Sequence, residues 1–206
     1  MRVLYIDTSS SYLYSAIVQD EELISSISEE YGQSLSEIAL PKIVEMFEKN
    51  NLSPKDVDKI IVVNGPGSFT GIRIGITIAK VFAWSLNTPI TTISSLEAMS
   101  VSNRDGKIHI PMLNARREYV YTAIYNEKGE IIHKPEHIKW DEIKKEIEEL
   151  SNYTIISNDE FDWDVEKTSY TPDFVSIVNK FKDKEDINPH AVNPEYLKLT
   201  EAEEKL

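Results

Sequence analysis

Short apolar runs separated by polar turns dominate the N-terminal part of the chain. Runs containing Val, Ile, Leu or Tyr follow each other closely at Arg2–Ile6, Tyr12–Val18 and Glu22–Ser28. Runs of this length and composition, bounded by Asp and Ser, are typical of β-strands. We therefore expect a three-stranded meander at the start of the fold.

A helical period follows the meander. Between Ser34 and Lys49 apolar residues recur every three or four positions, and Glu37 lies near the N-terminal end, where a negative charge is favourable. The alternation of elements then continues with strands at Ile60–Val63 and Ile90–Ile93 and helices at Ile72–Leu86 and Ser95–Val101.

The same order of elements begins again after the polar segment Ser102–Lys107. We expect strands at Ile108–Leu113, Glu118–Tyr125, Glu130–Ile138 and Tyr153–Ile156, and helices at Trp140–Leu150 and Phe174–Phe181. The repetition predicts an α/β fold with two related subdomains. We assign residues 1–103 to the first and 104–206 to the second, with the extreme C-terminal tail packing back on the first.

A glycine-rich loop joins a predicted strand to a predicted helix. Four of the seven glycines lie within Gly65–Gly75. A phosphate-binding P-loop would end in Lys followed by Ser or Thr, where Ile72 and Arg73 stand. A dinucleotide fingerprint needs the spacing G-x-G-x-x-G and an acidic residue about 20 positions later, but the next strand ends in Ser94 and Ser95. The remaining interpretation is a structural turn before a closely packed helix.

The helix after this loop carries a row of small residues. Gly71, Gly75, Ala79 and Ala83 recur every four positions and form one ridge with little side-chain bulk. Such a ridge permits close helix–helix packing. Its neighbour is either a helix of a partner protein or the Ser34–Lys49 helix of the same chain.

Composition narrows the possible partners. The 206 residues carry a net charge of −13, with 35 acidic and 22 basic residues, and the chain contains no cysteine. Nucleic acids are bound by Lys and Arg, so such an acidic chain is a poor autonomous binder, although Arg104, Arg116 and Arg117 form a local group. No apolar stretch approaches the roughly 20 residues of a membrane helix, and no signal peptide is recognised. We expect a cytoplasmic protein.

Few residues are candidates for catalysis or for binding a phosphate or a metal ion. Asp7 and Thr8 end the first strand, where they either contact a phosphate or metal or form a polar turn. His133 and His137 are four residues apart in an extended segment, so we expect no metal site there. Ser68 lies outside any nucleophile motif. We predict no catalytic residue, no metal and no cofactor.

Four segments together resemble a known family. Ile6–Ser9, Gly65–Gly75, Leu113–Tyr121 and Pro194–Lys198 occur in this order, and the chain is similar over its full length to the TsaB (YeaZ) family of bacterial tRNA threonylcarbamoyladenosine biosynthesis proteins. The resemblance implies an actin-like ATPase / ribonuclease H-like fold with two related subdomains.

The resemblance also implies a function. A family member is a non-catalytic scaffold that binds the catalytic TsaD subunit, works with the ATPase TsaE, and supports threonylcarbamoyl transfer to the adenosine beside the anticodon. It is expected to form a homodimer when alone and to reach tRNA only through the complex. The resemblance also implies that Asp7 and Thr8 are the remnant of a phosphate-binding loop. The expected partner interface consists of Leu35, Ile38, Ile43, Gly71, Gly75, Ala79 and Ala83.

One segment of the sequence distinguishes a non-catalytic scaffold from a metal-dependent enzyme of this fold. The catalytic relative carries an H-x-E-x-H segment that holds a metal, and the corresponding segment here is Ser95–Met99. Glu97 is retained, but Ser95 and Met99 replace the two histidines and are poor ligands for a hard divalent ion. The alternative to the scaffold is a stand-alone ATP-binding or metallopeptidase-like enzyme of the same fold.

Overall fold

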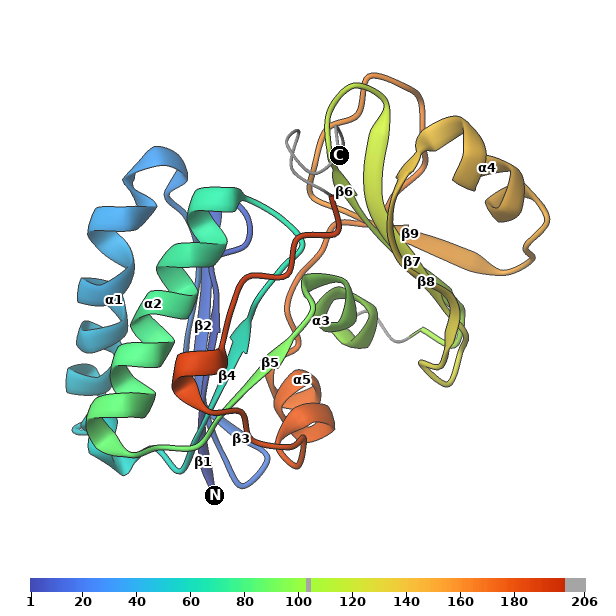
Figure 1. Ribbon diagram of the computed structural model, residues 1–206. Coiled ribbons are helices and arrows are strands. Elements are labelled where there is room, and N and C mark those ends of the chain that lie inside the picture. The colour runs from blue at the N-terminus through green and yellow to red at the C-terminus, as the bar shows by residue number, and fades with distance from the viewer. Residues whose placement is uncertain (103–104, 199–206) are drawn as a thin grey trace. The chain divides into compact units, whose positions relative to one another are not determined.

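The chain folds into two compact units in the computed structural model, which describes residues 1–102 and 105–198 (Figure 1). Unit 1 comprises Met1–Ser95 and Asp173–Glu195, and unit 2 comprises Leu96–Pro172 and, of the described C-terminal residues, Tyr196 to Lys198. These bounds differ from the predicted ranges 1–103 and 104–206. The segment from Leu96 belongs to unit 2, whereas Asp173–Glu195 returns to unit 1 because its helix buries apolar side chains there. The predicted packing of the extreme C-terminal tail on the first subdomain lies outside the described residues.

The sheet of unit 1 contains the predicted meander. Strand β1 pairs antiparallel with β2 and parallel with β4, β2 pairs antiparallel with β3, and β4 pairs parallel with β5, which gives the order β3-β2-β1-β4-β5. The central strands β1 and β4 are almost wholly buried, as expected for strands covered on both faces. The bounds are β1 Arg2–Asp7, β2 Tyr12–Gln19, β3 Glu22–Glu30, β4 Lys59–Val63 and β5 Ile90–Ile93.

Helices cover both faces of this sheet (Figure 1). Helices α1 (Leu35–Lys49) and α2 (Phe69–Leu86) lie on one face, and α5 (Phe174–Phe181) lies on the other. Successive residues of β1 point to opposite faces: Leu4 belongs to the core beneath α1 and α2, whereas the ring of Tyr5 lies 5.7 Å from that of Phe174 in α5. Short 3₁₀ turns occur at Gly32–Ser34, Pro54–Asp56 and Pro189–Ala191.

Helix α2 is a core helix with defined caps. The Oγ of Ser68 accepts a 3.2 Å hydrogen bond from the backbone N–H of Gly71, and Asn87 ends the helix in the left-handed conformation with φ of 55°. Among the described residues it is the one helix long and apolar enough to cross a membrane by length and composition. Seven of its residues are buried, so it packs as the core helix of a folded unit.

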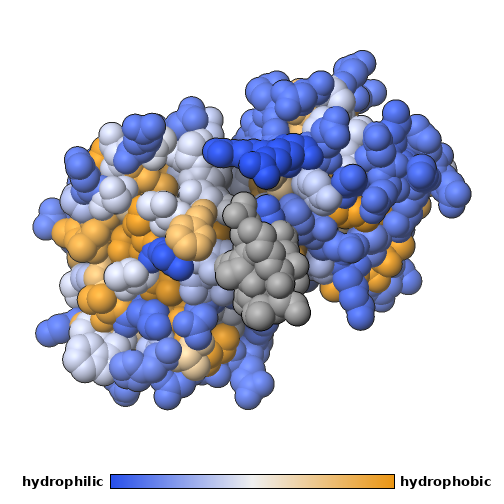
Figure 2. Space-filling model, turned by 45° about the horizontal axis from the view of Figure 1, so that its top comes forward, coloured by the Kyte–Doolittle hydropathy of each residue, from blue (hydrophilic) through white to orange (hydrophobic). Residues whose placement is uncertain are grey.

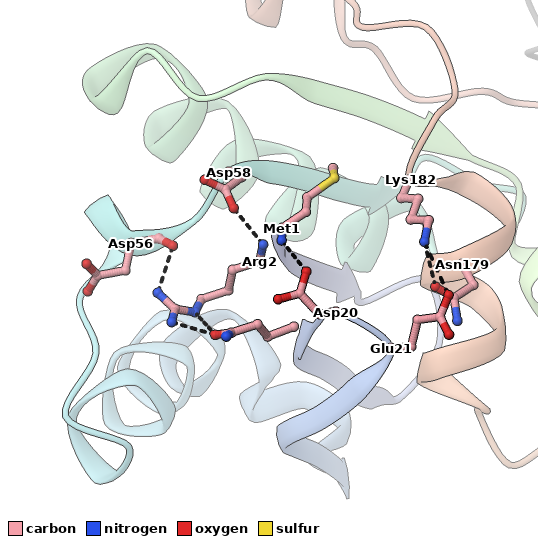
Figure 3. A network of polar contacts seen from close by, with 9 residues as sticks. Met1, Arg2, Asp20, Glu21, Asp56, Asp58, Asn179 and Lys182 are labelled. Atoms are coloured by element: carbon pink, nitrogen blue, oxygen red, sulfur yellow. Dashed lines mark hydrogen bonds and ion pairs between the residues drawn. The ribbon is translucent and has the colours of Figure 1, made fainter.

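A polar network fixes the start of β1 (Figure 3). The backbone N–H of Arg2 donates a 2.6 Å hydrogen bond to the carboxylate of Asp58, and its guanidinium donates a 3.0 Å bond to the carbonyl oxygen of Asp56. The amino group of Met1 forms an ion pair with Asp20 (Figure 3). The N-terminus is therefore tied both to the turn before β4 and to the β2–β3 turn.

Unit 2 repeats the arrangement on a smaller scale. Its sheet has the order β8-β7-β6-β9, with β6–β7 and β7–β8 antiparallel and β6–β9 parallel. Trp140, Ile143 and Ile147 of α4 pack on this sheet in a single apolar core. The bounds are α3 Ser95–Ser102, β6 Ile108–Asn114, β7 Tyr119–Tyr125, β8 Ile131–Lys139, α4 Trp140–Glu148 and β9 Tyr153–Ile156.

The two units share one order of elements. The series β1-β2-β3-α1-β4 of unit 1 corresponds to β6-β7-β8-α4-β9 of unit 2, and in both a fourth strand runs parallel to the first. The architecture is the predicted α/β class. The shared order supports the proposal that the two subdomains are related.

Candidate functional site

The glycine loop between β4 and α2 packs against other backbone segments of unit 1. Gly67 has φ of 151°, and a Cβ atom there would clash with the carbonyl oxygen of Ser9. Gly65 has φ of 126°, and a Cβ atom there would clash with the carbonyl oxygen of Glu195. The N–H of Ser68 donates a 2.7 Å hydrogen bond to the same Ser9 oxygen. Close approach of the chain to itself therefore requires these glycines, which favours the structural turn.

The residues predicted as a vestigial phosphate loop lie at the end of β1, beside the N-terminus of α2. The carboxylate of Asp7 is 3% exposed and accepts hydrogen bonds from the N–H of Ser9 (2.8 Å) and the hydroxyl of Tyr5 (3.3 Å). Burial raises the pKa of Asp7, and these hydrogen bonds oppose the shift. The buried hydroxyl of Thr8 donates a 2.7 Å bond to the carbonyl oxygen of Gly71. Both side chains are engaged internally, and nucleotide binding at Asp7 and Thr8 stays a prediction.

The ridge of small residues on α2 faces the sheet of its own unit. A Cβ atom at Gly71 would clash with the carbonyl oxygen of Thr8, and one at Gly75 would clash with the Thr8 hydroxyl. Ala79 and Ala83 are at most 1% exposed. The prediction that these residues contact a partner is therefore wrong. The close neighbour of Gly71 and Gly75 is the end of β1, and neither a partner helix nor α1 takes that place.

Two of the predicted interface residues on α1 are also buried. Leu35 is 3% exposed and Ile43 is 0% exposed, and both belong to the core between α1 and the sheet. Ile38 is only partly exposed. The prediction fails for Leu35 and Ile43 because the apolar stripe of an amphipathic helix marks the face turned to the core.

An open apolar groove lies between α1 and α2 instead. Its volume is about 460 Å³, and its walls include Leu40, which is 44% exposed, and Phe69, which is 55% exposed. The guanidinium of Arg73 lies 3.8 Å from the centre of the Phe69 ring, within the range of a cation–π contact. Figure 2 shows hydrophobic residues gathered on this side of unit 1. The other lining residues are Ser36, Thr70, Ile74, Thr77 and Ile78.

The exposed apolar surface continues along α2 and α1. Val81 is 55% exposed and Trp84 69% exposed on α2, and Val44 is 36% exposed on α1. The exposed side of α2 also carries the polar residues Thr70, Arg73 and Thr77. Large apolar side chains exposed together on such a side indicate a contact surface for a partner. The α1–α2 surface is defined here as Leu40, Val44, Phe69, Arg73, Val81 and Trp84.

The segment Ser95–Met99, which we compared with the metal motif of the catalytic relative, is largely buried. Ser95 is buried at the start of α3, and its hydroxyl donates a 2.6 Å hydrogen bond to the carbonyl oxygen of Pro66. Met99 is 3% exposed. Within residues 1–102 and 105–198, no group of three or more His, Cys, Asp or Glu side chains is arranged to hold a metal ion.

The two histidines of β8 have separate surroundings. The ring of His133 lies between carboxylates, with Nδ1 2.9 Å from Glu146 and Nε2 3.2 Å from Glu136. The ring of His137 stacks on Tyr119 at 4.6 Å. The spacing of four in the sequence therefore does not bring the two rings to one shared ligand position.

Comparisons with known proteins agree with this architecture. The family model described as TsaD, tRNA N6-adenosine threonylcarbamoyltransferase, matches residues 22–204. The tRNA threonylcarbamoyladenosine biosynthesis protein TsaB of Bacillus subtilis is 32% identical over 226 residues, which cover 100% of this chain and 97% of that protein. The TsaB of Escherichia coli is 29% identical over 148 residues, 66% of this chain and 64% of that protein.

Solved structures give the fold. YeaZ from Pseudomonas aeruginosa superposes with a TM-score of 0.70 at 18% identity, covering 95% of this chain and 99% of that chain. A protein with similarity to peptidase YeaZ from the same organism gives a TM-score of 0.78 at 17% identity, with 96% and 99% covered. The predicted actin-like ATPase / ribonuclease H-like fold is confirmed. The full-length similarity together with this fold shows that the chain belongs to the TsaB (YeaZ) family of tRNA threonylcarbamoyladenosine biosynthesis proteins.

Proposed function

We propose that this chain is a non-catalytic scaffold subunit that binds a TsaD-type catalytic subunit through the α1–α2 surface. The observation that carries the proposal is the exposed apolar groove between α1 and α2. Phe69 in its wall and Trp84 farther along α2 are both more than half exposed. Large aromatic residues and Arg are enriched among the residues that dominate binding energy at protein interfaces. Arg73 supplies a cation at the rim of the groove.

The occupant is a helix pair of the same architecture. The family model that matches this chain is that of TsaD, so a TsaD-type protein presents related helices. Two helices packed into a groove formed by two others bury the apolar side chains of both partners. A second copy of this chain carries the same surface, so the free protein forms a homodimer that the catalytic subunit displaces.

The absence of catalysis by this chain is supported by the internal use of its candidate groups. The Asp7 carboxylate and the Thr8 hydroxyl are hydrogen-bonded within unit 1, and the metal-binding histidines are replaced by Ser95 and Met99. The complex includes a TsaE-type ATPase, works in the cytoplasm, and reaches tRNA as an assembly. The chain needs no cofactor of its own.

A matched pair of variants tests the proposal. Leu40 and Leu23 are 44% and 46% exposed, but only Leu40 lies in the groove, whereas Leu23 lies on the edge strand β3. Leu40→Glu is expected to weaken binding to the TsaD-type subunit by at least about 30-fold, the effect of losing one dominant interface residue. Leu23→Glu is expected to bind as the unaltered chain does. Binding is measured by calorimetry, and both variants must keep the circular dichroism spectrum of the folded protein.

A reconstituted tRNA-modification assay gives the functional readout. Omission of this chain, or its replacement by Leu40→Glu, is expected to abolish threonylcarbamoyladenosine formation by the TsaD- and TsaE-type proteins. Modification at full rate without the chain would contradict the scaffold role. Equal binding of both leucine variants would contradict the assignment of the surface.

A further inference from the structure

The loop between β6 and β7 of unit 2 has an unusual backbone. Arg116, Arg117 and Glu118 have φ of 65°, 52° and 65°, so consecutive residues with side chains adopt the left-handed conformation. Residues other than glycine visit this region rarely and usually singly, and such positions concentrate at functional sites. The loop belongs to the Leu113–Tyr121 segment, and nothing in the docking surface on unit 1 accounts for it.

Hydrogen bonds hold this loop in one conformation. The N–H of Asn114 donates a 2.7 Å bond to the carboxylate of Asp159, and the N–H of Arg116 donates a 2.8 Å bond to the Asn114 side-chain oxygen. The N–H of Tyr119 donates a 3.0 Å bond to the carbonyl oxygen of Arg116. Both arginine side chains remain exposed. A fixed loop thus presents two guanidinium groups to the solvent.

A row of aromatic rings starts where the loop ends. His137 of β8 stacks on Tyr119 of β7, with ring centres 4.6 Å apart and planes 8° apart, and it contacts Tyr121 at 5.1 Å. The ammonium group of Lys139 lies 5.8 Å from the centre of the Tyr119 ring. The three rings are partly exposed. We call Tyr119, Tyr121 and His137 the aromatic ladder.

The ladder is not explained by the core of unit 2. Val120 of β7 and Ile138 of β8 pack in the core beneath α4, and side chains alternate between the faces of a sheet. Tyr119 and Tyr121, which flank Val120, therefore face away from α4, as does His137 beside Ile138. Packing of the unit 2 core accounts for Val120 and Ile138, but it does not account for stacked rings next to exposed cations on the opposite face of the sheet.

We propose that the aromatic ladder and the Arg116–Arg117 loop bind single-stranded RNA. Aromatic faces stack with unpaired bases, and a guanidinium matches the geometry of a phosphate oxygen pair. Two nearby carboxylates are already engaged: Asp159 accepts the Asn114 N–H, and Glu136 faces His133 at 3.2 Å. The exposed Glu118 lies on the loop itself and offsets part of its positive charge. The net charge of −13 limits the affinity of the whole chain, so the contact is local and of modest strength.

The test uses the full chain and a labelled single-stranded RNA oligonucleotide in fluorescence anisotropy. Unaltered protein is expected to bind with a dissociation constant of roughly 10⁻⁴ to 10⁻⁶ M at physiological salt. Tyr119→Leu and Tyr121→Leu are each expected to weaken binding by roughly 5- to 100-fold, because each removes one stacking platform. Tyr153→Leu, on the edge strand β9, is the matched control and is expected to bind normally.

The arginines are tested by salt dependence. The double variant Arg116→Gln, Arg117→Gln is expected to reduce the slope of log K against log salt by about 0.7 for each phosphate that the protein no longer neutralises. Glutamine keeps a long polar side chain on the strained loop. Lys145→Gln on α4 is the matched control and is expected to leave the slope unchanged. Melting curves must show that each variant remains folded.

Several outcomes would overturn the proposal. Absence of RNA binding by the unaltered chain is one, and equal binding by the tyrosine variants is another. Competition by inorganic polyphosphate that the tyrosine variants do not change would identify a charge-only anion site. Loss of TsaD-type subunit binding in the ladder variants, without loss of RNA binding, would make the patch a protein contact. The RNA-binding measurements need no partner, so their result is independent of the docking surface on α1 and α2.

Discussion

The hydroxyl of Thr8 donates a 2.7 Å hydrogen bond to the backbone carbonyl oxygen of Gly71, and it occupies the space that a side chain at position 75 would need. This contact locks the first turns of α2 against the end of β1. It explains why positions 71 and 75 of α2 have no side chain, and it removes these two glycines from the partner interface. The consequences can be measured as unfolding free energies.

Gly75→Ala is expected to destabilise the protein by about 1–3 kcal/mol, because the new Cβ atom meets the Thr8 hydroxyl. Thr8→Ala alone is expected to cost about 1 kcal/mol through loss of the hydrogen bond to Gly71. In the double variant the clash is absent, so Gly75→Ala should cost less in the Thr8→Ala background. Urea denaturation of the four proteins gives the coupling free energy.

Gly71→Ala provides the matched control for this cycle. Its Cβ atom would meet the backbone carbonyl oxygen of Thr8, which Thr8→Ala leaves in place. We expect Gly71→Ala to remain destabilising in both backgrounds, because Thr8→Ala does not remove this clash. If Gly75→Ala instead kept full stability and lost only partner binding, the ridge would belong to an interface after all.

Trp84→Ala is expected to separate binding from stability. The side chain is 69% exposed, so its removal should change the unfolding free energy by no more than about 0.5 kcal/mol. At a dominant interface position the same change costs about 2 kcal/mol or more of binding free energy. Calorimetric titration with the TsaD-type subunit and thermal melting of the free chain measure the two quantities. An unchanged dissociation constant would exclude Trp84 from the interface.

Asp7→Asn is expected to stabilise the protein at neutral pH. Burial raises the pKa of Asp7 above its unfolded value, so the folded state binds more protons and stability falls as pH rises through that interval. Asparagine can still accept the bond from the Ser9 N–H without a buried charge. The gain should be present at pH 7 and diminish towards about pH 4, near the unfolded pKa. Thermal melting across this range checks it, and a lower melting temperature at pH 7 would contradict it.

Asp105→Asn is expected to reduce the acid sensitivity of unit 2. Burial by itself raises the pKa of Asp105, but hydrogen bonds with His109 (3.0 Å) and Lys107 (3.1 Å) outweigh it and lower the pKa to about 2. Since the folded pKa lies below the unfolded value of about 3.9, the stabilisation is complete above pH about 4 and is lost as pH falls through 2.

The Asp105 carboxylate is 39% exposed, so solvent screening keeps this effect modest and added salt should weaken it. Urea unfolding at pH values from about 2 to 5 measures the slope of stability against pH. The exposed Asp183→Asn serves as control and should leave the slope unchanged. Identical slopes for Asp105→Asn and the unaltered chain would contradict the pairing.

The sequence by itself determined the elements and their order. Ile90–Ile93, Tyr153–Ile156 and Phe174–Phe181 have the predicted bounds, because each is a short apolar run or stripe between turn residues. The same local patterns were sufficient to predict the repeated order of strands and helices. The position of Asp7 and Thr8 at the end of the first strand also followed from pattern alone.

Only the tertiary structure decided which surfaces those elements cover. The small residues from Gly71 to Ala83 predict that another element packs closely against α2, but they do not tell whether that element is strand β1 or a helix. Phe69 and Trp84 are exposed on the same side of α2 as Arg73, so apolar character alone could not assign them to the core or to the surface. Phe174–Phe181 belongs to unit 1, although the strands of unit 2 separate it from the rest of unit 1 in the sequence. Its apolar side chains are buried by contacts in space, which sequence distance does not limit.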